Sequence, residues 1–156
     1  TVGGGLELAA ACHLRVADPT AFFALPEGSR GIYVGGGASV HVARLLGAPR
    51  MMDMMLTGRV LDAAAAERAG LVQYLMPEGA APDKAAELAA KVAEMAPLTV
   101  LGVLQALPRI QDMGEDDGLF VESMMAALAQ TGPEAAERLA DFVAKRGAKV
   151  SGPAGS

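Results

Sequence analysis

The segment Gly3-Gly4-Gly5-Leu6-Glu7-Leu8-Ala9-Ala10-Ala11-Cys12 decides how the rest of this sequence is interpreted. Residues 6–11 favour a helix, so the glycine triplet predicts a helix N-terminus whose backbone N–H groups a ligand can approach closely. Glu7 lies between two leucines in the first turn of this helix. Its carboxylate is either solvated beside the helix dipole or buried as an acid/base group next to an oxyanion donor, and the segment alone leaves both open.

A second glutamate follows an apolar run. Residues 21–25 predict a strand that Pro26 ends, and residues 27–31 predict a loop. Glu27 is therefore either an exposed turn residue or a functional group at the end of a strand. Two carboxyl groups in apolar surroundings can act as an acid/base pair, in which one delivers a proton while the other takes one from water.

The remaining helices and strands are predicted from the spacing of apolar residues and from the glycine, proline and capping residues between them. Strands are expected at 13–17 and 71–75, and helices at 38–46, after the triplet Gly35-Gly36-Gly37, at 50–56, and at 63–69 with Asp62 as N-cap. Beyond residue 83 the chain is mostly helical. The spacing predicts one buried face on each of the helices around 85–95 and 135–143, and burial on several sides for 119–129. Cys12 is expected to be a small core residue.

Composition excludes several classes of function. The 156 residues, 52% of them hydrophobic, suffice for one ordinary domain, and the net charge of −5 without tryptophan argues against nucleic acid. No apolar run could span a membrane, and a single cysteine favours a reducing, cytoplasmic compartment. His13 and His41 lie far apart without a metal-ligand motif, and neither triplet forms a nucleotide-binding loop. We therefore expect no metal and no separate cofactor.

With these motifs in place, the sequence resembles the crotonase (enoyl-CoA hydratase/isomerase) superfamily from Val2 to about Val150. Besides the first segment, the matching stretches in chain order are Phe23 to Glu27 with Gly31-Ile32, Gly35 to Gly37, Arg44 to Gly47, Leu56 to Arg59, Ala69 to Val72 and Phe142 to Arg146.

The resemblance implies an α/β fold. Residues 1–78 would form the C-terminal part of a crotonase-like ββα spiral, 79–150 a helical region that packs in trimers or hexamers, and 151–156 a disordered tail. Members of the family also carry an N-terminal portion before the first triplet. We expect this portion to be truncated here, or present as a separate piece.

The resemblance also implies an acyl-CoA thioester substrate, with coenzyme A as part of the substrate. Gly4 N–H would be one of two donors to the thioester oxygen, and Glu7 and Glu27 would be the catalytic carboxylates. The expected substrate-binding residues are Gly3, Leu25, Pro26, Ile32, Gly36, Phe142 and Lys145.

Segments 24–32 and 54–60 are more closely similar to the subgroup that contains methylthioacryloyl-CoA hydratase, which suggests that substrate and, as a related outcome, thioester hydrolysis. Two alternatives stay open. One is an enoyl-CoA isomerase, in which a single carboxylate shuttles the proton. The other is a non-catalytic remnant that binds acyl-CoA or serves only in oligomerisation.

The first prediction concerns the substrate. Offered crotonyl-CoA and methylthioacryloyl-CoA in parallel, an active protein removes the conjugated thioester absorbance, because water adds across the double bond. Free thiol that appears only with the methylthio substrate identifies hydrolysis as well. Turnover of neither substrate would favour the non-catalytic alternative.

Overall fold

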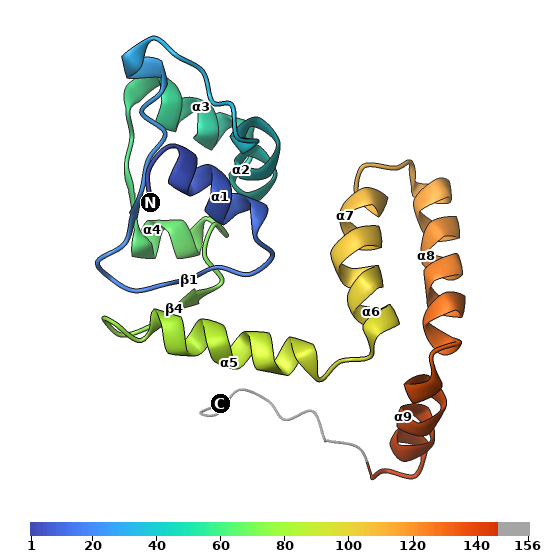
Figure 1. The fold of residues 1–156 in the computed structure, drawn as a ribbon. Coiled ribbons are helices and arrows are strands. Elements are labelled where there is room, and N and C mark those ends of the chain that lie inside the picture. The colour runs from blue at the N-terminus through green and yellow to red at the C-terminus, as the bar shows by residue number, and fades with distance from the viewer. Residues whose placement is uncertain (147–156) are drawn as a thin grey trace. The chain divides into compact units, whose positions relative to one another are not determined.

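The computed structural model describes residues 1–146 and is mainly helical, with short strands (Figure 1). The chain divides into two units at Ala90/Lys91, within helix α5, whereas the sequence suggested a boundary after residue 78. The elements of the first unit are α1 (Gly4–Ala11), β1 (Val16–Ala17), β2 (Phe22–Phe23), the 3-10 turn η1 (Gly28–Arg30), α2 (Ala38–Leu46), α3 (Ala48–Thr57), β3 (Leu61–Asp62), α4 (Ala63–Arg68), β4 (Tyr74–Leu75) and α5 (Ala81–Ala93). The predicted disordered tail, 151–156, lies outside the described residues.

The helices of the first unit begin and end close to where their signals predict. Helix α2 has the expected bounds and ends at Gly47. Helix α3 carries a proline in its first turn and ends at Gly58, whose φ of 76° is a conformation that glycine adopts without strain. The carboxylate of Asp62 accepts a hydrogen bond of 2.7 Å from Ala65 N and so caps α4, as predicted.

The strands are shorter than expected. β1 pairs in parallel with β4, β2 pairs antiparallel with β3, and each strand has two residues. A single parallel bridge joins Val2 to Ala24. The prediction of a loop at 27–31 is wrong, because residues 28–30 form the 3-10 turn η1, and β3 was not predicted at all.

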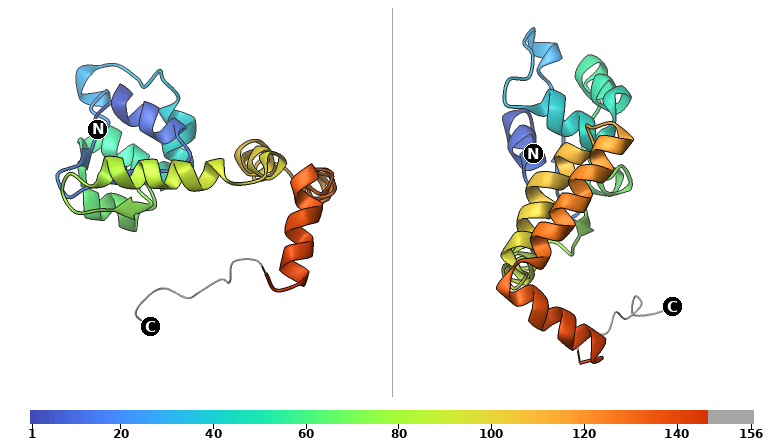
Figure 2. Two further views of the ribbon diagram at one scale, coloured as in Figure 1. Left: turned by 60° about the horizontal axis from the view of Figure 1, so that its bottom comes forward. Right: turned by 90° about the vertical axis from the view of Figure 1, so that its right-hand side faces the viewer.

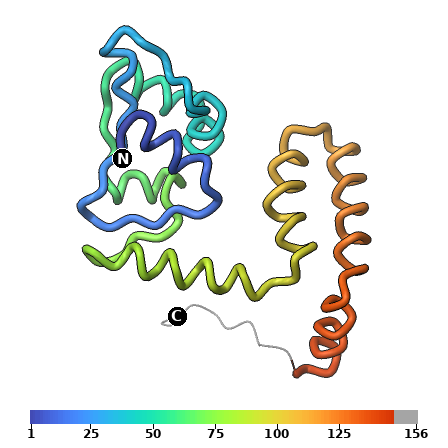
Figure 3. The backbone as a smooth tube through the Cα atoms, in the orientation of Figure 1, coloured from blue at the N-terminus to red at the C-terminus, as the bar shows by residue number. Residues whose placement is uncertain are grey.

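The core of the first unit lies between its helices. Helix α1 packs on α2, and α2 packs on α3 (Figure 3). A continuous apolar cluster contains residues of all three helices and of α4. Its largest fully buried side chains are Leu6, Leu25, Val42, Met54 and Leu71. The methionine-rich run on α3 therefore contributes mainly to packing, as a flexible apolar side chain does well.

A buried arginine joins β1 to the segment before β4. Arg15 Nε donates to Leu71 O at 2.5 Å, and its Nη1 donates to Cys12 O. Burial lowers the pKa of the Arg15 guanidinium, an effect partly opposed by the nearby Cys12. The prediction that Cys12 is a core residue is wrong, since its thiol is exposed while the neighbouring arginine is buried.

The second unit is built around a helical hairpin (Figure 2). Its elements are α6 (Pro97–Leu101), the π-helical turn η2 (Gly102–Ala106), α7 (Leu107–Ile110), α8 (Glu115–Gln130) and α9 (Pro133–Val143). The first three run on as one rod, which lies antiparallel to α8. Within the rod, Leu107 N donates to Gly102 O, the longer hydrogen bond of a π turn. Pro108 follows directly and has no N–H, which accounts for the local widening.

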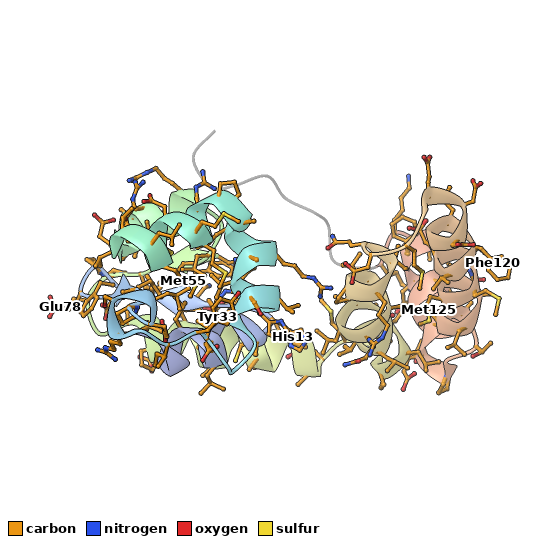
Figure 4. All side chains as sticks on the ribbon, turned by 90° about the horizontal axis from the view of Figure 1, so that it is seen from above. His13, Tyr33, Met55, Glu78, Phe120 and Met125 are labelled. Carbon is orange, nitrogen blue, oxygen red and sulfur yellow. The ribbon has the colours of Figure 1, made fainter. Side chains whose placement is uncertain are left out.

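The predictions of burial in the helical part are wrong within the part of the chain that the structure describes. No residue of α5 is buried, and Gly118 is the one buried residue of α8. Phe120 is 65% exposed and points away from the rod, whereas Met125 faces it (Figure 4). Phe142 on α9 is 75% exposed. The apolar faces exist as predicted, but residues 1–146 leave them largely exposed. Among residues 1–146, no helix is long and apolar enough to cross a bilayer.

The packing of η1 on α3 gives a prediction about Gly28. A Cβ at this position would fall on the backbone carbonyl oxygen of Met55, whereas a Cβ at Gly35 would meet nothing within 4 Å. We expect Gly28→Ala to lower the free energy of unfolding by about 1–3 kcal/mol, because the backbone of α3 or η1 must shift. Urea titrations of Gly28→Ala and of the control Gly35→Ala measure this, and equal stabilities would contradict the assignment.

Candidate active site

Glu7 is buried, at 7% exposure, and it bridges two helices. It stands in the first turn of α1, and its Oε1 accepts hydrogen bonds from Gly36 N at 2.7 Å and Ala38 N at 3.2 Å. These donors lie at the beginning of α2, where the helix dipole and the unpaired N–H groups favour a negative charge. Charge-assisted hydrogen bonds of this kind contribute about 1.5–3 kcal/mol each.

The sequence carries a signal for this contact in the residue that precedes α2. Helix α2 begins after Gly37, which has no side chain to cap the helix, and the structure shows no side-chain cap from its own N-cap residue. An uncapped helix N-terminus needs an acceptor from elsewhere. Gly36 leaves room for it, since a Cβ there would lie 2.8 Å from Glu7 Oε2. The backbone of the second glycine triplet therefore binds the carboxylate of Glu7, which follows the first triplet.

Glu27 is also buried, at 8% exposure, but it lacks such partners. Its Oε2 is a buried oxygen without a hydrogen-bond partner in the part of the chain that the structure describes. Its Oε1 lies against Gly3, where an added Cβ would come within 2.7 Å of it. A buried carboxylate oxygen without a donor is unusual in a folded protein and requires a functional or structural explanation.

The backbone of Gly3 holds both glutamates in place. Gly3 N donates to Ala24 O at 2.9 Å, which fixes the segment that leads to Glu27. Gly3 O accepts from Glu7 N at 3.0 Å and begins the helix that carries Glu7. Glycine is required here because the backbone has φ 55° and ψ −124°. No direct contact between the two carboxylates is seen.

Gly4 supplies an unpaired backbone donor next to them. Gly3 N and Gly5 N both donate to backbone carbonyls. Gly4 is the first residue of α1, so its N–H has no acceptor within the helix, and none is seen among residues 1–146. Gly4 is exposed, and nothing lies within 4 Å of the position of a Cβ. Its N–H is therefore accessible to a ligand oxygen.

The predicted substrate-binding residues fall in different environments. Gly3 and Gly36 each contact one of the two glutamates, and Ile32 is exposed on the segment between Glu27 and Gly36, next to Tyr33, which Figure 4 shows. Leu25 is 0% exposed and packs in the core, and Pro26 beside it is half-buried. Phe142 and Lys145 belong to the second unit, so their predicted role stays a prediction. No three His, Cys, Asp or Glu side chains within residues 1–146 are grouped to hold a metal.

A helix that begins in a glycine triplet, with a buried glutamate and a free N–H in its first turn and a second buried glutamate alongside, matches a known class of protein. The sequence profile of the enoyl-CoA hydratase/isomerase family matches residues 1–152. The chain belongs to this family, the crotonase superfamily, and has a crotonase-like fold.

Individual relatives agree with this assignment. A probable mitochondrial enoyl-CoA hydratase 2 of Arabidopsis thaliana is 35% identical over 145 residues, covering 93% of this chain and 48% of the relative. The 2,3-dehydroadipyl-CoA hydratase of Escherichia coli K12 is 33% identical over 145 residues, covering 93% and 57%. The crystal structure of a putative enoyl-CoA hydratase from Rhodopseudomonas palustris superposes with a TM-score of 0.89 at 55% identity, covering 96% of this chain and 58% of that one. The chain thus spans about half the length of the curated relatives it matches.

The position of Gly3 gives a prediction with a neighbouring control. Gly3→Ala forces a side chain onto a backbone with φ 55° and ψ −124°, at a cost of about 1–3 kcal/mol, and also against Glu27 Oε1. We expect a loss of at least that much in the free energy of unfolding. Gly5→Ala meets only a methyl group at 4.0 Å inside a helix, so its stability should stay the same or rise by up to about 1 kcal/mol. Urea unfolding compares the two, and equal effects would contradict this account of the triplet.

Proposed function

We propose that the protein hydrates a 2-enoyl-CoA thioester, with Glu7 and Glu27 as the acid/base pair and Gly4 N–H as an oxyanion donor. The observation that carries the proposal is the buried, unpartnered Oε2 of Glu27. It occurs beside a helix whose first N–H is free, in a chain of the enoyl-CoA hydratase/isomerase family. An acid/base group and a donor to developing negative charge are what the reaction needs.

Glu7 supports the proposal as a fixed base. The N–H groups of Gly36 and Ala38 bind its Oε1, so the orientation of the carboxylate is set before any substrate binds. Its Oε2 makes no hydrogen bond within residues 1–146 and can accept one from water. In the proposed reaction this water attacks the β-carbon of the substrate as Glu7 draws off its proton.

Glu27 acts as the proton donor. Its carboxyl group delivers a proton to the α-carbon as the carbon–oxygen bond forms at the β-carbon. Negative charge passes onto the thioester oxygen as the enolate develops, and Gly4 N–H donates a hydrogen bond to it. The two carboxyl groups have different surroundings, one with two N–H donors and one with none, which suits different roles in the proton transfers.

The proposal also covers the substrate, the oligomeric state, the complete fold and the cellular compartment. The substrate would be methylthioacryloyl-CoA, on the similarity of segments 24–32 and 54–60, with short-chain 2-enoyl-CoA as the broader choice and thioester hydrolysis as a related outcome. The exposed apolar side chains of α8 and α9 suit a homo-oligomer, a trimer or hexamer, and the short strands suit a ββα spiral that further chain completes. A reducing compartment, proposed to be the cytoplasm, agrees with the single exposed cysteine.

Replacement of each glutamate by glutamine tests the proposal. The amide oxygen of Glu7→Gln can still accept from Gly36 N and Ala38 N, so the fold persists while the proton acceptor is lost. Glu27→Gln removes no hydrogen bond, so its stability should not fall. We expect kcat for crotonyl-CoA to fall by about 10²–10⁴ in each variant.

The assay uses the purified 156-residue chain and, where the gene encodes more, the whole gene product. Thermal unfolding confirms that both variants are folded. Oxygen from ¹⁸O-labelled water in the product distinguishes hydration from isomerisation, which incorporates none. Wild-type protein without hydration activity, or turnover within about twofold of wild type in both variants, would overturn the proposal.

A further inference from the structure

A small pocket on the first unit, outside the candidate active site, is lined by three arginines. It has a volume of about 190 Å³ and is formed by Arg50, Asp53, Arg59, Leu61, Ala65, Arg68 and Ala69. We propose that this arginine pocket binds a phosphate group, as free inorganic phosphate or as the phosphate of a small monoester.

The arginines come from α3, from the turn that follows it and from α4. Arg50 stands near the start of α3, Arg59 follows Gly58 at its end, and Arg68 is the last residue of α4. One side of α4 and its C-cap lines the pocket with Ala65, Arg68 and Ala69, which are three and four residues apart. Leu61 of β3 also lines the pocket. The pocket is therefore lined by three arginines together with the apolar side chains of Leu61, Ala65 and Ala69.

Asp53 orders the pocket without neutralising it. Its Oδ2 accepts from Arg59 Nη1 at 2.9 Å and its Oδ1 from the Thr57 hydroxyl at 2.9 Å, so both carboxylate oxygens are engaged. These hydrogen bonds, the one from Arg59 foremost, lower the pKa of Asp53 and keep it charged. Three positive charges and one negative charge leave the pocket at +2, in a chain whose net charge is −5.

All three guanidinium groups have unused donors. No hydrogen bond or ion pair of the Arg68 side chain is seen among residues 1–146, and the Arg50 side chain makes one long contact, from Nη1 to Leu46 O at 3.4 Å. Arg59 keeps further N–H groups after its single bond to Asp53, and its side chain is 61% exposed. Several unengaged guanidinium donors around one cavity are the arrangement that recognises phosphate oxygens.

Charge and size select the ligand. A phosphate monoester carries a charge of about −1.5 to −2 at pH 7, which matches the pocket, whereas a carboxylate carries less and offers fewer oxygens. A water molecule takes up roughly 30 Å³ of liquid, so the cavity holds a phosphate group and a few waters. The site would act in addition to the acyl-CoA site.

Titration of the full chain at low ionic strength tests the inference, with inorganic phosphate and glycerol 3-phosphate in separate arms and acetate as the anion control. Binding is followed by calorimetry or by the ³¹P signal. We expect saturable binding with Kd at or below about 1 mM for at least one phosphate, weakening as salt is raised, and none for acetate. Whichever of the two compounds binds with the lower Kd shows whether the pocket prefers free phosphate or a phosphate monoester.

Two variants distinguish specific phosphate binding in the arginine pocket from nonspecific attraction of the anion by positive charge. Arg68→Gln breaks no hydrogen bond or ion pair within the described residues and should weaken binding about tenfold to a hundredfold. Arg146→Gln is the charge-matched control, because Arg146 is also exposed but is not among the residues that line the arginine pocket; binding should stay within about twofold. Absence of saturable binding, or equal weakening by both variants, overturns the proposal. A change in oligomeric state on Arg68→Gln, without phosphate binding to the wild type, also overturns it and assigns the arginines to contacts between copies.

Discussion

The hydrogen bonds from Gly36 N and Ala38 N to the carboxylate of Glu7 are the interaction on which the first unit depends. They place a negative charge at the N-terminus of α2 and satisfy donors that no residue of α2 itself caps. They also explain the spacing of the two glycine triplets. The first begins the helix that carries Glu7, and the second allows the α2 backbone to approach that carboxylate closely.

The two glutamates illustrate how one arrangement gives two carboxyl groups different properties. Glu7 has two backbone donors on one oxygen, while Glu27 has a buried oxygen with none. Both depend on Gly3, whose backbone joins the start of α1 to Ala24 and whose missing side chain leaves space for the Glu27 carboxylate. A strained conformation that glycine alone adopts easily is thus used where the two chain segments meet.

The helical part of the chain shows why an apolar pattern does not by itself establish burial. Residues 119–129 of α8 are apolar on nearly every side, yet a hairpin partner can cover only the side that faces it. Met125 contacts the rod at Gly102, whereas Phe120 remains in solvent. The periodicity correctly indicates a helix, but burial depends on which surfaces are present to pack against it.

The sequence by itself determined most helix positions, because propensity, capping and glycine or proline punctuation act within a few residues. The N-cap at Asp62, the helix over 38–46 and the end of α3 at Gly58 are all local features of this kind. It also indicated Glu7 and Glu27 as unusual, since each is a charge among apolar neighbours. Only the tertiary structure decided that Glu7 binds the start of α2, that Glu27 lacks a partner, and that Gly4 keeps a free N–H. The surroundings of the two glutamates, and the absence of any other acceptor for Gly4 N–H among residues 1–146, depend on segments far apart in the chain, and these are set by how the segments pack rather than by local preference.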